Sequence, residues 1–149
     1  MVTSRPTSQC KAVPANSMLR MSSRNKSNLR LLVIDDDRLM RAVLVSLIRR
    51  EGYENVDAAK SGQEGLAKLL VQRFHIVFLD IDMRGLNGIE TLRAINESQF
   101  DVKVVMVSGI STPDTVLAAK KENAVGFIVK PPTQKKIGDA INVCLDRLS

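Results

Sequence analysis

The chain has 149 residues, of which 44% are apolar, and this length and composition suit one globular domain with its own core. It contains no apolar run of membrane-spanning length, which argues against a transmembrane protein. Cys10 and Cys144 are far apart in the chain, and neither stands in a metal-binding spacing. We therefore expect a reduced protein of the cytoplasm.

The net charge of +6 comes entirely from the start of the chain. Residues 1–30 carry six basic side chains and no acidic one, so the 16 basic and 16 acidic side chains that follow cancel. We therefore expect no nucleic acid to bind through the body of the protein. Residues 1–29 are rich in Ser, Asn, Pro and Arg, which predicts a solvated, disordered leader. A contact of this leader with membrane or nucleic acid, and a true start at Met18 or Met21, stay open as alternatives.

Residues 30–149 are predicted to form one domain in which a strand is followed by a helix five times. The strands are short apolar runs bounded by polar residues or glycine. They are expected at residues 31–34, 56–59, 76–79, 104–107 and 127–129. Strands that alternate with helices imply a parallel sheet with helices on both faces and right-handed crossovers.

After each strand, apolar side chains recur at helical spacing and capping residues mark the helix ends. The expected boundaries are a stop at Gly52, a capping box of Ser61 with Glu64, and helix starts at Gly88, Thr112 and Thr133. The expected apolar faces are Met40, Val43, Leu44, Leu47 and Ile48; Leu66, Leu69 and Leu70; Ile89, Leu92 and Ile95; Val116 and Ala119; and Ile137, Ile141, Cys144, Leu145 and Leu148.

Five polar side chains follow the apolar runs, namely Asp35, Asp36, Asp80, Ser108 and Lys130. Because the carboxyl ends of parallel strands meet at one edge of a sheet, we expect them to converge. Asp80 is the natural nucleophile for a phosphoryl group, and Asp35 and Asp36 would repel it unless a cation were present. Mg²⁺ prefers such carboxylates together with phosphate oxygens. Lys130 would neutralise the phosphoryl oxygens, and Ser108 would donate a hydrogen bond to one of them.

Four short motifs in a fixed order carry a family resemblance. They are Val33-Ile34-Asp35-Asp36, Leu79-Asp80-Ile81-Asp82-Met83 with Gly88 downstream, Val107-Ser108-Gly109, and Val129-Lys130-Pro131. In these motifs the body of the chain resembles the receiver domain of two-component response regulators. The resemblance implies an α/β, flavodoxin-like (βα)5 three-layer sandwich whose parallel sheet has strand order 2-1-3-4-5.

The resemblance also implies a function and its residues. A histidine kinase or histidine phosphotransfer protein would phosphorylate Asp80, with Mg²⁺ bound by Asp35, Asp36, Asp80 and the backbone carbonyl of Asp82. Ser108 and Phe127 would form the switch, and a downstream protein would bind through residues 108–149. A phosphorylation-linked homodimer is among the assemblies that the family allows. The peptide bond between Lys130 and Pro131 is expected to be cis.

The chain departs from the usual family pattern at four positions, none of which removes a catalytic group. They are Arg84 in place of proline, Asn87 in place of an acidic residue, Phe127 in place of tyrosine and Pro132 in place of an aromatic residue. His75 is the only histidine and precedes the third strand, at the opposite edge of the sheet from the acidic residues. The phosphoryl donor must therefore be another molecule.

Three other interpretations stay open from the sequence. Asp80-Ile81-Asp82 resembles the Asp-x-Asp of haloacid-dehalogenase-type phosphatases, although that family carries the motif on its first strand. A receiver fold kept only for docking would have an incomplete acidic site, whereas here the site is complete. The chain is either a stand-alone regulator or a fragment of a larger effector protein. Apart from promoting its own phosphorylation and dephosphorylation, we do not expect it to be an enzyme.

Overall fold

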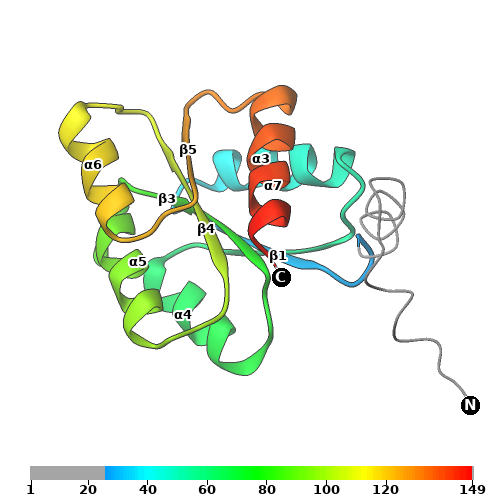
Figure 1. The fold of residues 1–149 in the computed structure, drawn as a ribbon, viewed down its shortest axis with the longest axis horizontal. Helices are drawn as coiled ribbons and strands as arrows, with labels where there is room; N and C mark the ends of the chain where they lie inside the picture. The colour runs from blue at the N-terminus through cyan, green and yellow to red at the C-terminus, as the bar shows by residue number, and fades with distance from the viewer. Residues whose placement is uncertain (1–25, 149) are drawn as a thin grey trace, which may run out of the picture.

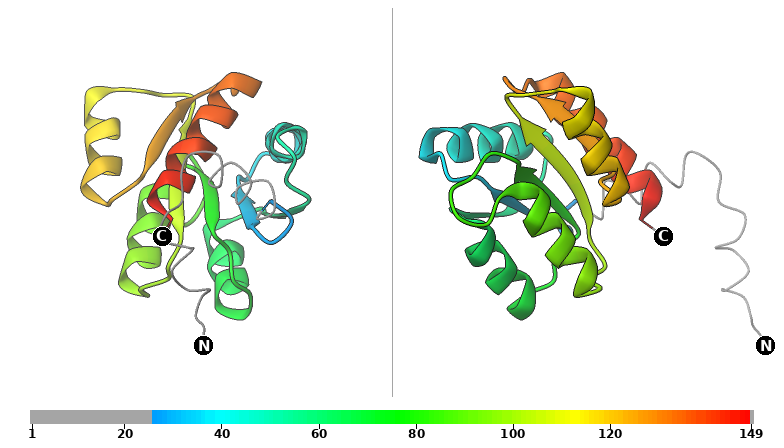
Figure 2. Two further views of the ribbon diagram at one scale, coloured as in Figure 1. Left: turned by 45° about the vertical axis from the view of Figure 1, so that its right-hand side comes forward. Right: turned by 90° about the vertical axis from the view of Figure 1, so that its left-hand side faces the viewer.

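The computed structural model describes residues 26–148 and shows a five-stranded parallel sheet with helices on both faces (Figures 1 and 2). The strand order is β2-β1-β3-β4-β5, as predicted. The strands are β1 (Arg30–Ile34), β2 (Asn55–Ala59), β3 (Ile76–Asp80), β4 (Lys103–Ser108) and β5 (Gly126–Val129). The helices are α3 (Arg38–Arg50), α4 (Gly62–Val71), α5 (Gly88–Glu97), α6 (Pro113–Lys121) and α7 (Gln134–Arg147).

The side chains of the central strands alternate between two cores because successive residues of a strand point to opposite faces. Leu31 and Val33 pack with α3 and α7, whereas Leu32 and Ile34 pack with α4 and α5. Both faces of the middle strands are therefore covered, which explains why those strands read as continuous apolar runs. Figure 1 shows α3 and α7 on one side of the sheet and α4, α5 and α6 on the other.

Each helix of the described chain begins at a side chain that accepts a hydrogen bond from the first turn. These residues are Asp37, Ser61, Asn87, Thr112 and Thr133. The predicted starts near Gly88, Thr112 and Thr133 are therefore confirmed. Such caps satisfy backbone N–H groups that have no partner within the helix.

One predicted core position of α4 is wrong. Leu70 was expected to be buried, but its side chain is 74% exposed. The buried face of α4 instead runs through Gly62, Gly65 and Leu69. A Cβ atom on Gly65 would lie 2.3 Å from Cδ1 of Ile34, so this glycine lets the helix approach the sheet along a face that does not include Leu70.

Two further details differ from the expectation. Ser61 accepts from the backbone N–H of Glu64, as in a capping box, but the Glu64 carboxylate accepts from the N–H of Lys60 rather than from that of Ser61. In α3, Val43 is 37% exposed, and Val45 packs against the core instead.

The start of α5 fixes the backbone after β3. The N–H of Gly88 donates to the carbonyl of Ile81 at 2.8 Å. A Cβ on Gly88 would lie 2.2 Å from the carbonyl oxygen of Asp80, so only glycine permits this approach. The last residue of β3 is therefore held between the sheet and the first turn of α5.

The predicted leader, residues 1–29, lies mostly outside the described residues, as does Cys10. Within the described part, Leu29 is already buried in the α3 and α7 core, and Lys26 donates to the carbonyl of Glu51 at 2.9 Å. Cys144 is a buried free thiol whose pKa is raised to about 12 by burial. No helix among residues 26–148 is long and apolar enough to cross a membrane.

Candidate phosphoryl-acceptor site

The predicted site residues meet at the carboxyl edge of the sheet. Asp35 follows β1, Asp80 and Ser108 end β3 and β4, and Lys130 follows β5. The side chains of Asp35, Asp80 and Ser108 are buried, which is unusual for polar groups. The sequence prediction that these groups converge is therefore matched by the geometry.

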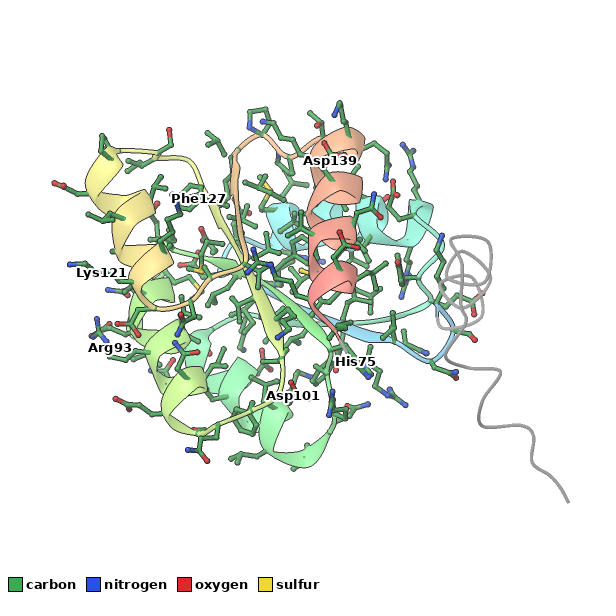
Figure 3. The ribbon with its side chains drawn as sticks, viewed as in Figure 1. His75, Arg93, Asp101, Lys121, Phe127 and Asp139 are labelled. Atoms are coloured by element: carbon green, nitrogen blue, oxygen red, sulfur yellow. The ribbon has the colours of Figure 1, made fainter. Side chains whose placement is uncertain are left out.

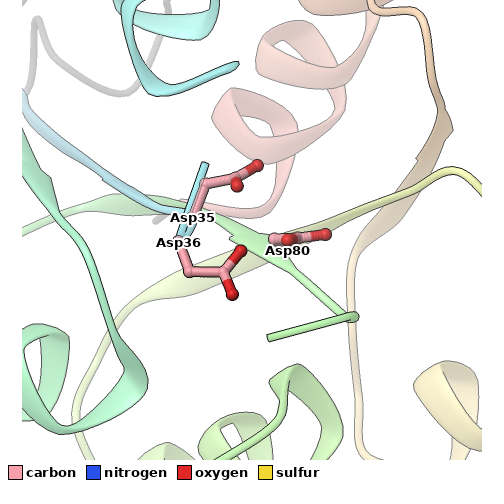
Figure 4. A group of neighbouring side chains, drawn as sticks. All are labelled: Asp35, Asp36 and Asp80. Atoms are coloured by element: carbon pink, nitrogen blue, oxygen red, sulfur yellow. The ribbon is translucent and has the colours of Figure 1, made fainter. Parts of the chain in front are cut away.

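Three carboxylates form the centre of the site. Asp35, Asp36 and Asp80 each offer an oxygen within 4.8 Å of the others, and Asp36 alone of the three is exposed. Figure 4 shows Asp35 and Asp36 beside the end of β3, which carries Asp80. Asp35 and Asp80 are buried, and the charge of Asp35 raises the free energy of ionising Asp80.

Lys130 supplies the opposing charge. Its Nζ lies 3.2 Å from Oδ1 of Asp80 and 3.3 Å from Oδ2 of Asp35, so it bridges the two buried carboxylates. Burial alone would lower the pKa of Lys130, but the attraction of Asp35 and Asp80 outweighs it and the pKa is raised. Lys130 is therefore charged at neutral pH. The peptide bond between Lys130 and Pro131 is cis, as expected.

One cation does not balance the site. Burial, together with the charge of Asp35, raises the pKa of Asp80 to about 6, although Lys130 and the backbone N–H of Asp82 act in the opposite direction. Without further positive charge, keeping Asp80 ionised therefore costs free energy. A carboxylate in this state favours the binding of a cation beside it.

Backbone donors that the sequence analysis did not identify orient the carboxylates. The N–H of Asp37 donates to Asp35 at 2.8 Å, that of Arg84 to Asp36 at 3.1 Å and that of Asp82 to Asp80 at 3.4 Å. Asp37 lies in the loop after β1, whereas Asp82 and Arg84 lie in the loop after β3, so the bond from Arg84 to Asp36 joins the two loops. Only the loop geometry could have revealed them, since a backbone N–H leaves no mark in the sequence.

Arg41 also holds the site, through its guanidinium, which donates to the carbonyl of Asp35 at 2.8 Å. Arg41 stands one turn into α3, so its position relative to Asp35 follows from the helical spacing once Asp37 is known as the cap. This contact joins the first loop of the site to α3.

The hydroxyl of Ser108 makes two contacts in this structure. It donates to Oδ2 of Asp82 at 3.4 Å and accepts from the N–H of Ile110 at 3.0 Å. The sequence analysis assigned only the backbone carbonyl of Asp82 to the site, so this side-chain contact is an addition. Gly109 has no atom within 4 Å of where a Cβ would lie, which leaves the entrance beside Ser108 open.

The second predicted switch residue, Phe127, is half-buried in β5. It pairs in register with Met106 and packs with the core that also contains Ala119 of α6 (Figure 3). Met106 and Ser108 alternate onto the same face of β4, so Phe127 and Ser108 both face the side of the sheet covered by α6. Ala119 is the only buried residue of α6, so few apolar contacts hold this helix against the sheet.

The acidic residues fit a hard divalent cation. Mg²⁺ binds oxygen ligands, and three carboxylates offer them here within a small space, one of them open to water. The backbone of Asp82 lies next to Asp80, which agrees with its carbonyl as a further ligand, although that assignment stays a prediction. No Cys or His belongs to this group, which suits Mg²⁺ better than a soft metal.

We expect Asp80→Asn to stabilise the metal-free protein at pH 7. The pKa of Asp80 is raised to about 6 from its ordinary 3.8, so its contribution lowers the free energy of unfolding as pH rises through that interval. The asparagine variant should be more stable by roughly 3 kcal/mol at pH 7 and should lose the advantage below about pH 4. Urea unfolding across this range measures the difference, and Asp101→Asn, at an exposed ion pair, is the matched control. An equal gain in both variants would contradict the electrostatic account.

Known proteins share this fold. Residues 31–142 match the response regulator receiver domain. The chain is 33% identical over 113 residues to the chemotaxis protein CheY of Thermotoga maritima, covering 76% of this chain and 94% of that protein. The structure of response regulator TrrA from T. maritima, in complex with Mg²⁺ and BeF, superimposes with a TM-score of 0.70 and 28% identity, covering 78% of this chain and 98% of that one. A chain of the CheX–CheY–BeF₃–Mg²⁺ complex from Borrelia burgdorferi gives a TM-score of 0.72 and 29% identity, covering 76% and 86%. The chain therefore belongs to the response regulator receiver domain family.

Proposed function

We propose that the protein is a phosphoacceptor switch in which a histidine kinase or histidine phosphotransfer protein phosphorylates Asp80 in the presence of Mg²⁺. The observation that carries this proposal is the buried Asp80 carboxylate with Lys130 at 3.2 Å and two further carboxylates beside it. The protein promotes only its own phosphorylation and dephosphorylation. No contact in the described residues favours the phosphatase alternative.

In the proposed reaction, an oxygen of Asp80 attacks the phosphorus of the donor phosphohistidine. The new P–O bond forms as the P–N bond breaks, and the imidazole leaves with the electron pair. Lys130 then lies beside the phosphoryl oxygens as a fixed positive charge. The hydroxyl of Ser108 turns from Asp82 to donate to one of those oxygens. When bound by Asp35, Asp36, Asp80 and the carbonyl of Asp82, Mg²⁺ supplies the remaining positive charge.

The donor is a separate molecule. The one histidine, His75, lies in the turn before β3, at the opposite edge of the sheet from Asp80 (Figure 3). Its Nδ1 accepts a hydrogen bond from the N–H of Arg30, and burial with the nearby Arg73 lowers its pKa. His75 is therefore a neutral packing residue in this proposal. The relatives solved with Mg²⁺ and a beryllium fluoride group support the cofactor assignment.

Incubation with acetyl phosphate and Mg²⁺ should add one phosphoryl group to the wild-type chain. Asp80→Asn should abolish the gain, because no carboxylate remains to attack, whereas Asp36→Ala should shift the Mg²⁺ dependence to higher concentration. Intact-mass spectrometry measures the product. Asp82→Asn is the matched control, since it keeps the backbone carbonyl and should still be modified. Wild-type modification of Asp80→Asn would show that the nucleophile is another residue.

We propose that the signal leaves through residues 108–149, and first through α6 and β5. Two observations support this proposal. Ser108 and Phe127 face the same side of the sheet, and only one residue of α6 is buried. Because few apolar contacts hold α6, its local opening should cost less free energy than that of the central strands. Phe127 lacks a hydroxyl, so its part in the switch rests on packing alone. The proposal includes a homodimer that forms when Asp80 is phosphorylated.

Amide exchange should change mainly in residues 108–130 when beryllium fluoride and Mg²⁺ are added. Capture of Ser108 by the phosphoryl mimic removes its contact with Asp82, and a switch requires that the two states differ in affinity for the ligand. Hydrogen–deuterium exchange with peptide mass spectrometry measures the change. Asp80→Asn should show none. A response confined to the loop after β3 would instead favour the segment around Arg84 as the docking surface.

A further inference from the structure

Of the three carboxylates drawn in Figure 4, that of Asp36 has the fewest restraints on its position. Asp35 and Asp80 are only 0% and 2% exposed, and each forms an ion pair with Lys130. Asp36 is exposed, and among residues 26–148 it forms no ion pair. Its position in the metal-free protein therefore depends on hydrogen bonds alone.

One hydrogen bond within the described part of the chain reaches the Asp36 carboxylate. The backbone N–H of Arg84 donates to Oδ2 of Asp36 at 3.1 Å. The two residues belong to different loops, after β1 and after β3. The bond therefore holds the carboxylate from outside its own loop and leaves the second oxygen, Oδ1, open to a ligand.

The loop after β3 is built to hold the backbone of Arg84 in one place. Ile81 and Met83 are buried in the core that α4 and α5 cover. The N–H groups of Met83 and Gly88 both donate to the carbonyl of Ile81, at 3.2 Å and 2.8 Å. Directly after Arg84, Gly85 turns the chain with a φ of +73°, which glycine adopts without strain. The loop is thus anchored on both sides of Arg84, and the N–H keeps a defined direction.

The side chain of Arg84 does not explain its place beside the acidic residues. It is exposed, and among residues 26–148 it makes no hydrogen bond or ion pair. A guanidinium has donors but no acceptor, so it cannot be a ligand of a cation. Its positive charge would oppose a cation nearby rather than attract one. The group through which Arg84 contacts the site is its backbone N–H.

This N–H is a feature that the usual residue at position 84 cannot supply. Proline, which Arg84 replaces in the family pattern, has no backbone N–H. In the sequence, the replacement is conspicuous as an added positive charge. In the structure, the difference that reaches the site is an added hydrogen-bond donor.

We propose that Arg84 is a positioning residue for the cation site and acts through its backbone N–H, which holds the Asp36 carboxylate in place to bind Mg²⁺. The inference rests on the proposed function, in which Asp36 is a ligand of Mg²⁺. An exposed aspartate that is not held loses side-chain freedom when it binds a cation. The bond from Arg84 restricts Asp36 already in the metal-free protein, so less freedom is lost on binding. Hydrogen-bond partners of metal ligands commonly raise metal affinity in this way.

The bond also fixes the two loops of the site relative to each other. Asp36 lies in the loop after β1, and the Arg84 N–H belongs to the loop that follows Asp80. Lys130 joins the same two strand ends through the buried carboxylates of Asp35 and Asp80. The buried part of the site is therefore held by Lys130, and the exposed part by Arg84.

A Mg²⁺ titration of the ¹⁵N-labelled full chain, followed by the amide chemical shifts of the two loops, tests the role of this N–H. Arg84→Pro removes both the donor and the charge, whereas Arg84→Ala removes the charge alone. The dissociation constant for Mg²⁺ should be about tenfold higher in Arg84→Pro than in Arg84→Ala. Arg84→Ala itself should stay within about twofold of the wild-type chain, because salt screens an exposed charge. Equal weakening in the two variants would overturn the proposal, since the guanidinium would then be the cause.

The same two substitutions in an Asp36→Ala chain separate the hydrogen bond from a distortion of the loop. Without the Asp36 carboxylate the N–H has no acceptor, so the two variants should bind Mg²⁺ within about twofold of each other. A difference that persists in this background would overturn the proposal, because proline would then act on the loop itself.

Amide exchange measures the hydrogen bond without any change at Arg84, and it decides the question even if Arg84→Pro does not fold. In metal-free buffer, the Arg84 N–H should exchange with solvent about tenfold faster in Asp36→Ala than in the wild-type chain, since a bond to a charged acceptor is lost. The N–H of the next residue, Gly85, is the control and should change by less than about twofold. Equal changes at the two amides would overturn the bond.

Failure of this inference is distinguishable from failure of the proposed function. Acetyl phosphate could modify Asp80 in a Mg²⁺-dependent reaction while Arg84→Pro and Arg84→Ala bind Mg²⁺ equally well. That result would overturn the role of the Arg84 N–H and leave the phosphoacceptor function standing. A wild-type chain whose amide shifts do not respond to Mg²⁺ would overturn both.

Discussion

The repulsion between two buried carboxylates is the constraint on which the candidate site depends. Asp35 and Asp80 are both withdrawn from water at the ends of neighbouring strands, and the single ammonium of Lys130 bridges them. Burial and then the charge of Asp35 raise the pKa of Asp80, and Lys130 offsets these effects only in part. A divalent cation would stabilise the ionised carboxylates of this site. With the cation bound, a negatively charged phosphoryl group would no longer be repelled from Asp80.

The fold orients these carboxylates through backbone groups as well as through side chains. Two loops direct three N–H groups at carboxylates, and the absence of a side chain on Gly88 lets α5 press against the end of β3. The donor loops are short and follow buried strands, so the carboxylates are oriented before any ligand arrives. Such pre-organisation is what electrostatic stabilisation of a transferred group requires.

Most of the architecture could be predicted from the sequence because local signals and global fold agree. The strand runs, the caps at Thr112 and Thr133 and the convergence of Asp35, Asp80 and Lys130 all follow from period, capping chemistry and the parallel sheet. Leu70 was misplaced because apolar character was counted without the glycines of α4, which set how closely the helix packs. The hydrogen bond from Ser108 to Asp82 left no sequence signal, since it depends on side-chain direction at a loop.

Charge arrangement was the other feature that composition concealed. A body with equal numbers of acidic and basic residues reads as neutral, yet the folded chain places carboxylates at the sheet edge and arginines along α3. Arg41 of α3 joins the two features, because its guanidinium donates to the carbonyl of Asp35.

The most direct measurement of the central claim is a ¹³C NMR titration of the Asp80 carboxyl carbon, with and without Mg²⁺. In metal-free buffer the midpoint should lie at about 6, above the ordinary value for an aspartate, and saturating Mg²⁺ should move it down because the cation favours the ionised form. Asp80→Asn identifies the resonance by its loss. A midpoint near 4 that does not respond to Mg²⁺ would contradict the account, because Asp80 would then be neither held against its neighbour's charge nor placed to bind the cation.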